Sequence, residues 1–301
     1  MLILISLLFV FILALVWFYY AYVIETKLYQ THKLVVDLTF QATNLNILHI
    51  SDLHLCSPES HKINFLKNIS DNDLDLVFLT GDVFENYSGL PYICQILSRT
   101  PKIGAYAVLG NHDYYDYRWI NKTIGKIIKR LKHPTQRRDV SSMIEALQNA
   151  NFKVLRNEVE VIDKYKIGII GIDYPTVEYQ KLESLVKQIP DDYLKLVLFH
   201  IPLNLQNMVK LGVNIAFGGH THGGQIKLPY IGAVFTDSEL PRDKASGLFN
   251  YEQTYFHVSN GAGADPKTNI RFLCPPSATI LQVRSKESLK CQAKLYNIVQ
   301  E

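Results

Sequence analysis

The strongest constraint on the fold is a repeated pattern in which short apolar runs each end in polar residues suited to catalysis. The run 45–50 is followed by Asp52 and His54, and the run 74–80 is followed by Asp82. Apolar runs of this length are typical of strands buried on both faces of a sheet. Because open α/β sheets bind ligands at the carboxyl ends of their strands, we expect these side chains to lie close together.

The pattern continues through the second half of the chain. The runs 105–109, 194–199 and 213–217 lead to Asn111, His112, Asp113, His200, His220 and His222. We expect further strands at 166–172, 255–259 and 279–283, and helices at 60–70, 141–149, 177–188 and 203–211. Strands that alternate with helices predict an α/β layered domain.

Each of these polar residues, taken singly, has a simple structural explanation. Asp82 and Asn111 suit turns, Asp52 suits a helix cap, and His200 suits a buried position in the core. In an extended backbone His220 and His222 would face one target together, whereas a glycine-rich turn would leave both exposed. Their occurrence as an ordered set at successive strand ends favours a shared site.

The N-terminal segment carries no charged side chain from Met1 to Ile24. This length exceeds the roughly 20 apolar residues that a membrane-spanning helix needs. A cleaved signal peptide is the alternative, but it would have a basic start and a small-residue cleavage site. We expect a single-pass anchor in the inner (cytoplasmic) membrane, and Lys27 and Lys33 beyond it favour a cytoplasmic position for the remainder.

The rest of the chain suits one globular domain with appendages. We divide it into an anchor at 1–24, a connector at 25–44, a domain at 45–285 and a tail at 286–301. The formal net charge of +3 is too small to imply a nucleic-acid partner. The four cysteines are scattered, which favours reduced thiols over a disulfide framework or a zinc knuckle.

The segment 116–139 is strongly basic. Its apolar residues recur at helical spacing, so we expect a basic amphipathic helix inserted in the domain. Such a helix suits an anionic membrane surface, a cap over a pocket, or ordinary packing with a solvated face. The basic residues are Arg118, Lys122, Lys126, Lys129, Arg130, Lys132, Arg137 and Arg138.

The ordered motifs resemble those of the calcineurin-like metallophosphoesterases across residues 45–285. The family motifs Asp-x-His, Gly-Asp, Gly-Asn-His-Asp, a lone His and Gly-His-x-His are matched at 52–54, 81–82, 110–113, 200 and 219–222. The sequence around 51–55, 218–225 and 271–276 resembles the membrane-associated bacterial branch, which includes YkuE-like and YaeI-like proteins and UDP-diacylglucosamine pyrophosphatases of lipid A synthesis. The resemblance implies a four-layer α-β-β-α sandwich of two mixed sheets, preceded here by the transmembrane helix.

The resemblance also implies a site for two divalent metal ions. One ion would be held by Asp52, His54 and His222, the second by Asn111, His200 and His220, and Asp82 would bridge both. Mixed nitrogen and oxygen donors favour Mn²⁺, Fe or Zn²⁺ over Mg²⁺, and we expect Mn²⁺ to be the activator. Hydrolysis would proceed through a hydroxide that bridges the two ions.

His112 is expected to be a general acid, with Asp113 orienting its ring or raising its pKa. The alternative is that His112 only supports the site. Three functional hypotheses follow: a membrane-anchored hydrolase of a lipid-linked or nucleotide-sugar phosphate substrate, a broad phosphodiesterase or phosphatase of the cell envelope, and a scaffold without turnover. A phospholipid bilayer is the expected partner in the first.

Overall fold

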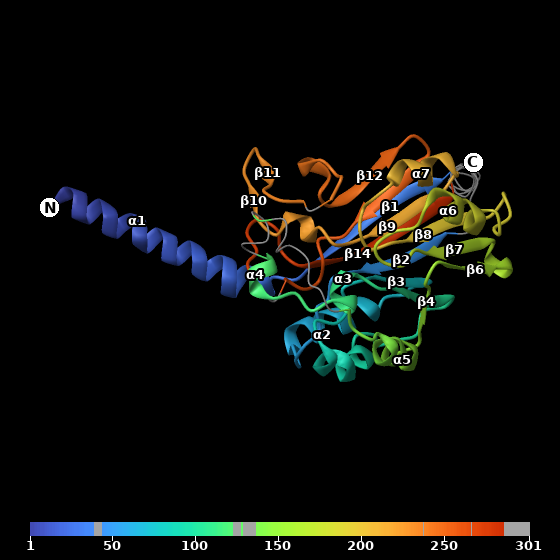
Figure 1. The fold of residues 1–301 in the computed structure, drawn as a ribbon, viewed down its shortest axis with the longest axis horizontal. Coiled ribbons are helices and arrows are strands. Elements are labelled where there is room, and N and C mark those ends of the chain that lie inside the picture. Colours follow the sequence, from blue (N-terminus) through green and yellow to red (C-terminus); the bar gives the residue numbers. More distant parts are fainter. Residues whose placement is uncertain (39–43, 123–127, 129–136, 237, 266, 286–301) are drawn as a thin grey trace, which may run out of the picture.

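Two six-stranded mixed sheets face each other at the centre of the protein (Figure 1). The computed structural model describes residues 1–38, 44–122, 128, 137–236, 238–265 and 267–285. The first sheet has the order β1 (Gln30–Leu38), β14 (Ser277–Ser285), β2 (Leu45–Ile50), β3 (Leu76–Thr80), β4 (Gly104–Val108) and β5 (Phe152–Val154). The second has the order β12 (Gly247–Tyr251), β13 (Thr254–Val258), β9 (Ile215–Gly218), β8 (Leu194–Leu198), β7 (Ile167–Gly171) and β6 (Glu158–Ile162).

Helices cover the outer face of each sheet. The first sheet packs on α2 (Ser60–Ser70), the 3-10 segment η3 (Tyr87–Gln95) and α5 (Ser141–Asn149). The second packs on α6 (Tyr179–Val186) and α7 (Leu205–Lys210). Each long helix turns one apolar stripe inward, as Ile63, Leu66 and Ile69 of α2 illustrate. The four-layer α-β-β-α sandwich is therefore confirmed.

The space between the sheets is filled by apolar side chains from both. Ile47 and Phe78 of the first sheet meet Leu196 and Phe217 of the second, and none of the four is exposed. All five residues of β3 and of β8 are buried, which explains why these strands are mostly apolar, with Thr80 and Lys195 as the polar members, rather than alternating. Burial on both faces places the ends of these strands at a fixed edge of the sandwich.

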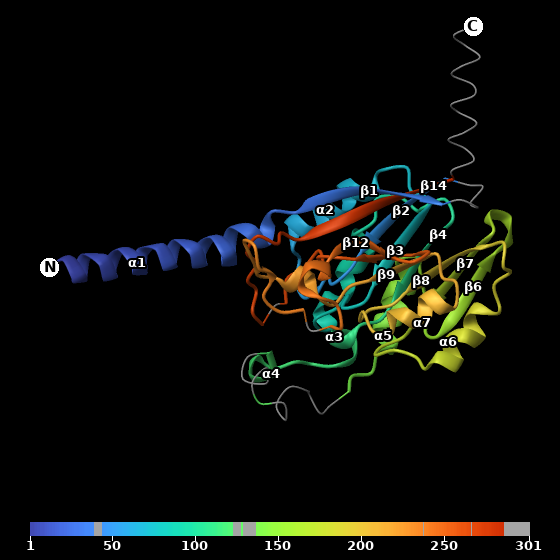
Figure 2. The same ribbon diagram turned by 90° about the horizontal axis from the view of Figure 1, so that it is seen from above.

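The apolar helix α1 (Leu2–Tyr19) projects away from the domain (Figures 1 and 2). A π-helical turn, η1 (Tyr20–Ile24), and a 3-10 turn, η2 (Glu25–Lys27), carry the chain from α1 into β1. Within the described residues, the continuous helical segment Leu2–Lys27 is the only one long and apolar enough to cross a membrane. None of the residues of α1 is buried. A signal sequence at the N-terminus would satisfy the same criteria.

Residues 25–44, expected as a connector, contain strand β1. This strand pairs in parallel with β14 along its whole length, from Gln30 opposite Ser277 to Leu38 opposite Ser285. Its first residues are polar and mostly exposed, and its only apolar run, Leu34 to Val36, is too short to mark a strand in the sequence. Pairing with a distant strand decides its structure, and the N-terminal helix is thereby joined closely to the sheet.

Several short elements were not expected from the sequence. They are β5, β6, β12, the 3-10 segments η3, η6 (Asp163–Tyr165), η7 (His222–Gly224) and η8 (Arg242–Lys244), and a hairpin of β10 (Lys227–Leu228) and β11 (Gly232–Ala233). Of the basic segment 116–139, the structure shows one helical turn, α4 (Trp119–Lys122), and residues 137–139. Most of that expected helix, and the tail 286–301, lie outside the described residues.

Candidate metal centre

The predicted ligands converge at the carboxyl ends of strands from both sheets. Asp52 and His54 follow β2, Asp82 follows β3, and Asn111 follows β4 at the start of the short helix α3 (Asn111–Tyr114). The second sheet contributes His200 after β8 and both His220 and His222 after β9. Only His220 among these residues is partly exposed, and the other six are buried.

Five of the seven residues have a backbone in the left-handed region. The φ angles are 53° at Asp52, 48° at His54, 51° at Asp82, 70° at His220 and 49° at His222. Non-glycine residues rarely adopt this conformation, and such strain concentrates at functional sites. It also changes the expectation for His220 and His222, which do not lie on an extended backbone but flank a tight turn.

One group of donor atoms comprises Asp52, His54, Asp82 and His222, all within 4.8 Å of one another. The Nε2 atoms of His54 and His222 are 3.2 Å apart. His222 Nε2 lies 3.5 Å from Asp52 Oδ1, and His54 Nε2 lies 4.0 Å from Asp82 Oδ2. The structure therefore brings together the residues expected around one ion.

A second group contains Asp82, His200 and His220, again within 4.8 Å. His200 Nε2 lies 3.3 Å from Asp82 Oδ1 and 3.0 Å from the Asn111 side-chain oxygen. His220 Nδ1 lies 2.9 Å from the same Asn111 oxygen. The two carboxylate oxygens of Asp82 thus face different groups, and His220 and His222 belong to different groups.

The spacing of these donors fits metal coordination. Ligand atoms about 2.1 Å from one ion, at angles near 100°, stand about 3.2 Å from each other. The distances in both groups, from 2.9 to 4.0 Å, lie around this value. Carboxylate, amide and imidazole donors at such spacing form two adjoining sites that share Asp82.

Backbone contacts hold the donors in place. The His220 N–H donates to both oxygens of Asp52 at 3.1 Å, and the His112 N–H donates to Asp82 Oδ1 at 2.7 Å. His200 Nδ1 lies 2.9 Å from the Thr80 carbonyl oxygen, so this nitrogen carries the proton and Nε2 is left as the donor to an ion. Position 219 must be a glycine, because the Cβ atom of any other residue there would overlap Ser51 Oγ and Asp52 Oδ2.

The charges of the cluster stabilise one another despite burial. Burial opposes ionisation of Asp82, but His200 and His112 nearby lower the pKa of its carboxyl well below the usual range. Burial likewise opposes the charge on His200, yet Asp82 and then Asp52 raise the pKa of its imidazole to about 9. The same carboxylates that attract protons to the imidazoles would attract a dication, which must displace those protons.

Glu85 is a member of the site that sequence reasoning missed. Its Oε2 atom lies 2.9 Å from His112 Nδ1 and 3.2 Å from His54 Nδ1. Burial opposes its ionisation, but the hydrogen bonds from His112 and His54 lower the pKa of its carboxyl. The only available signal was a carboxylate three residues after Asp82, in an otherwise apolar stretch.

Asp113 has a different position from the one expected. Its Oδ1 accepts the Phe84 N–H at 2.9 Å, and its Oδ2 accepts the N–H groups of Gly110 at 2.8 Å and Val83 at 3.4 Å. Burial, and then the nearby Asp82, raise the pKa of its carboxyl to about 6. Asp113 ties the two motif loops together, and Glu85 is the carboxylate that contacts the His112 ring.

Comparison with known proteins places this arrangement in a family. The family model for calcineurin-like phosphoesterases matches residues 45–224, which include every proposed ligand. The chain is a calcineurin-like phosphoesterase. Its buried cluster of histidines and aspartates is the metal-binding site of a metal-dependent phosphoesterase.

Curated members of the calcineurin-like phosphoesterases resemble this chain over most of its length. It is 28% identical to the metallophosphoesterase YkoQ of Bacillus subtilis, over 79% of this chain and 83% of that protein. It is 25% identical to the UDP-2,3-diacylglucosamine pyrophosphatase LpxG of Chlamydia trachomatis, with the same coverage. It is 25% identical to the phosphodiesterase YaeI of Escherichia coli, over 80% of this chain and 83% of that protein.

A buried arginine supports the metal centre of this calcineurin-like phosphoesterase from behind. Arg271 has no exposed surface, and its guanidinium donates to the carbonyl oxygens of Cys274, Asn260, Gly261 and Gly263. Its Nη2 atom also lies 3.4 Å from His222 Nδ1. Arg271 lies in the stretch 271–276 that carries part of the family resemblance, but only the structure shows that it binds two loops beside His222.

Proposed function

We propose that this protein is a membrane-anchored hydrolase of phosphodiester or pyrophosphate bonds. The observation that carries the proposal is the pair of donor groups that meet at Asp82, which lines the same cavity as His112 and accepts its backbone N–H. One ion is assigned to Asp52, His54 and His222, the second to Asn111, His200 and His220, and Asp82 to both. The mixed nitrogen and oxygen donors support Mn²⁺, with Zn²⁺ or Fe as alternatives.

Each residue has a defined task in this reaction. Two divalent ions, when bound, supply a hydroxide near neutral pH and withdraw charge from the phosphoryl oxygens. Glu85 accepts a hydrogen bond from the Nδ1–H group of His54. This contact leaves Nε2 of the same ring free to face its ion. Glu85 also orients His112, which donates a proton to the departing oxygen. No protein nucleophile is required.

The substrate that we propose is lipid-linked or a nucleotide sugar, of the UDP-2,3-diacylglucosamine type. The likeness to LpxG supports this choice, as does the direct connection of an apolar helix to the catalytic domain. The likeness to the phosphodiesterase YaeI favours the second candidate, a broad-specificity phosphodiesterase or phosphatase of the cell envelope.

We further propose that the helix is retained as an anchor in the inner membrane, with the domain in the cytoplasm. Residues just beyond α1 are integrated in the domain, which supports retention over cleavage. Ala21 is fully buried and its carbonyl accepts the Arg271 N–H at 3.0 Å. The buried Glu25 accepts the Cys274 N–H at 2.5 Å. A cleavage that removed Ala21 and Glu25 would expose the loop that contains Arg271 and Cys274, which supports the metal centre.

Purified full-length protein in detergent tests the proposal. With Mn²⁺ we expect turnover of UDP-2,3-diacylglucosamine that exceeds turnover of bis-p-nitrophenyl phosphate, and loss of both in Asp82→Ala. Faster turnover of the simple diester would favour the broad-specificity enzyme. If the protein turns over neither substrate with Mn²⁺, Zn²⁺ or Fe²⁺, the proposal fails and the non-catalytic scaffold is favoured.

A further inference from the structure

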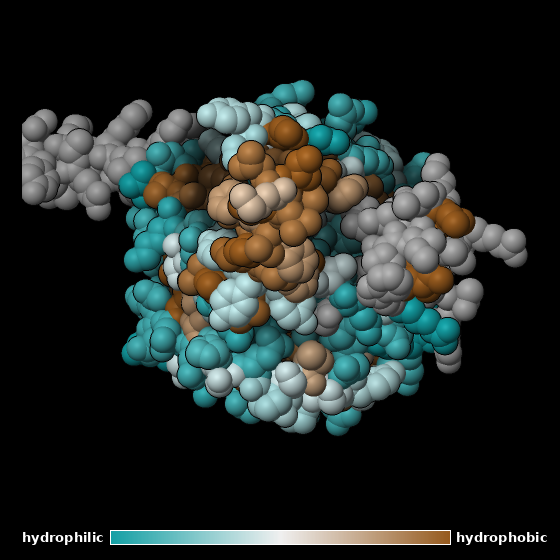
Figure 3. Space-filling view, turned by 90° about the vertical axis from the view of Figure 1, so that its left-hand side faces the viewer, coloured by the Kyte–Doolittle hydropathy of each residue, from teal (hydrophilic) through white to brown (hydrophobic). Residues whose placement is uncertain are grey.

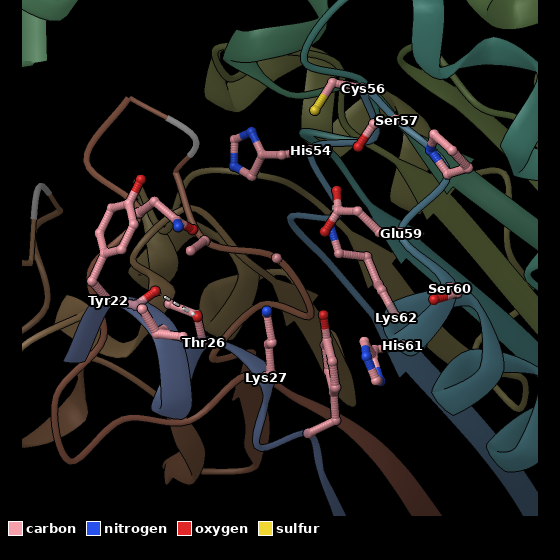
Figure 4. A pocket seen from close by; sticks show the side chains of 16 residues that line it. Tyr22, Thr26, Lys27, His54, Cys56, Ser57, Glu59, Ser60, His61 and Lys62 are labelled. Carbon is pink, nitrogen blue, oxygen red and sulfur yellow. Dashed lines mark hydrogen bonds and ion pairs between the residues drawn. The ribbon is translucent and has the colours of Figure 1, made fainter. Parts of the chain in front are cut away.

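A cavity of about 500 Å³ lies between the end of the anchor helix and the start of α2 (Figure 4). Tyr22, Val23, Thr26 and Lys27 form one wall, directly after the apolar span. Segment 56–62 forms the opposite wall, and Tyr29, His54, Gly263, Ala264 and Asn269 complete the lining. The membrane-proximal helix is therefore part of the cavity and not a tether at a distance from it.

The cavity reaches the metal centre. His54, assigned to one ion, lines it and is drawn at its edge in Figure 4. A smaller cavity of about 70 Å³ is lined by Asp82, Asn111, His220 and His222 of the same centre. A phosphate at the centre would adjoin both cavities, and the larger one is the one beside the anchor.

The depth of the cavity relative to a bilayer follows from helix geometry. The 18 residues of α1 extend about 27 Å, close to the hydrocarbon thickness of about 30 Å. Tyr22 to Lys27 then lie roughly 5 to 12 Å beyond the end of α1, where the lipid headgroups lie. The cavity is thus at headgroup level when α1 spans the membrane.

The surface around the anchor supports this position. In Figure 3 α1 points towards the viewer, and its apolar residues contribute to the hydrophobic surface at the centre of the view. The domain adds exposed apolar residues of its own: Leu228, Tyr230 and Ile231 of the β10–β11 hairpin, with exposed fractions of 39%, 108% and 55%, and Leu273 with 49%. Lys227 N–H donates to the Phe272 carbonyl, and the Phe272 ring contacts Trp17 of α1, so the hairpin lies beside the anchor. Exposed apolar residues at this level suit contact with a bilayer.

The lining of the cavity suits an anionic, hydroxyl-bearing group. Lys62 is buried and is neutralised by Glu59, with a distance of 2.9 Å between Lys62 Nζ and Glu59 Oε2. Lys27 makes no ion pair among the described residues, which leaves one net positive charge, and Figure 4 shows its ammonium directed into the space. Hydroxyl groups of Ser57, Ser60, Tyr22 and Tyr29 offer hydrogen bonds to a sugar or glycerol.

We infer that this cavity is the subsite for the lipid side of the substrate, a membrane lipid whose phosphoryl group is attached to glycerol or a sugar. The inference rests on the proposed function and deepens it. The lipid backbone fills the cavity between Thr26 and Ser57, its phosphoryl group reaches the metal centre beside His54, and its acyl chains remain in the bilayer along α1. The anchor helix is then a wall of the active site and contributes to specificity.

Binding by full-length, Mn²⁺-loaded protein in detergent tests the subsite without requiring turnover. The probes are dihexanoyl phosphatidic acid below its micelle concentration and inorganic phosphate, each measured by titration calorimetry. The variants are Thr26→Trp and Ser57→Trp, which fill the cavity from opposite walls. The control is Gln206→Trp, in a cavity of about 580 Å³ beside α7.

We expect the lipid to bind the wild type at least about tenfold more tightly than phosphate. Each filling variant should remove that difference and leave the phosphate Kd within about twofold, whereas Gln206→Trp should preserve it. An unchanged lipid Kd in both filling variants would overturn the inference, as would equal weakening of both probes or wild-type preference for free phosphate. Failure of the proposed function would show separately, as absent turnover of bis-p-nitrophenyl phosphate by the wild type.

Discussion

Glu85 Oε2 lies 2.9 Å from His112 Nδ1, so a buried carboxylate fixes the ring that stands beside the shared ligand Asp82. An imidazole held through Nδ1 has Nε2 as the atom that can carry a transferable proton. His112 lines the cavity that also contains Asn111 and His220. This arrangement matches the requirement for a general acid at the leaving group.

His112→Ala should keep the metals but lose turnover, and the loss should be larger for substrates whose leaving group needs a proton. We expect kcat to fall on the order of 10²- to 10³-fold for substrates with poor leaving groups, and far less for p-nitrophenyl esters. Steady-state kinetics across leaving groups, together with metal analysis by mass spectrometry, measures both effects. Loss of metal would refute the acid assignment, and an equal loss for all leaving groups would favour a supporting role.

Glu85→Gln should resemble a weaker form of that variant. The amide keeps the volume but removes the negative charge that faces the Nδ1 atoms of His112 and His54. We expect kcat to fall about tenfold or more with little change in KM, and metal affinity to weaken through His54 by about 10- to 100-fold. Kinetics and metal titration that match the wild type would show that Glu85 has no part in positioning.

Asp82→Asn should damage both metal sites at once. Asparagine offers one oxygen in place of two, whereas Asp82 Oδ1 faces His200 and Oδ2 faces His54. We expect fewer than two ions per chain and a rate lower by more than about 100-fold. Asp192→Asn is the matched control, because Asp192 is exposed and pairs only with Lys166 among the described residues. Full occupancy with two ions in Asp82→Asn would argue against a shared ligand.

The buried pair His49 and His257 should make the fold sensitive to acid. Their Nδ1 atoms are 2.6 Å apart between the sheets. Burial, and then His257, lower the pKa of His49 well below the usual range, and burial followed by His32 lowers the pKa of His257 to about 3. Because both residues stay neutral in the fold, the unfolded chain binds more protons below pH about 6.5, and stability falls as pH decreases towards 3.

The expected loss is up to about 1.4 kcal/mol per pH unit for each histidine. Urea unfolding at pH 7 and pH 5, compared between the wild type and His257→Gln, isolates this contribution from the titration of the metal centre. We expect a smaller difference between the two pH values in the variant. Parallel curves would show that the pair does not titrate on unfolding.

Glu25→Ala should loosen the attachment of the N-terminal helix to the domain. The Glu25 carboxylate accepts a hydrogen bond from the Cys274 N–H, and the Cys274 carbonyl oxygen accepts one from Arg271. Glu25 is buried, with 2% of its surface exposed. Loss of a buried hydrogen bond to a charged group costs about 1.5 to 3 kcal/mol, which thermal unfolding in detergent would register as a lower Tm. Glu183→Ala, which removes an exposed pair with Lys187, should change stability by less than about 0.5 kcal/mol. Equal effects in the two variants would contradict the docking of the N-terminal helix on the domain.

The sequence by itself determined the layered α/β class, the central strands and the candidate ligands. Strands such as β3 and β8 are buried on both faces, so their apolar runs are visible without any knowledge of their neighbours. The left-handed turns after them are occupied by Asp52, Asp82 and His220, which appear in the sequence as short motifs at strand ends. The uncharged N-terminal segment likewise depends on local composition alone.

Only the tertiary structure decided how those residues are supported. The family resemblance implied that His220 and His222 belong to different groups and that Asp82 is shared, and the structure brings these donors together in that arrangement. The contact of the His112 ring with Glu85, and the position of Asp113 between two motif loops, depend on distances between loops far apart in the chain. Strand β1 exists because β14 provides its hydrogen-bonding partner, and the segment after α1 is fixed to the domain because the N–H groups of Arg271 and Cys274 donate to Ala21 and Glu25. These features are set by non-local contacts, which no local pattern of residues encodes.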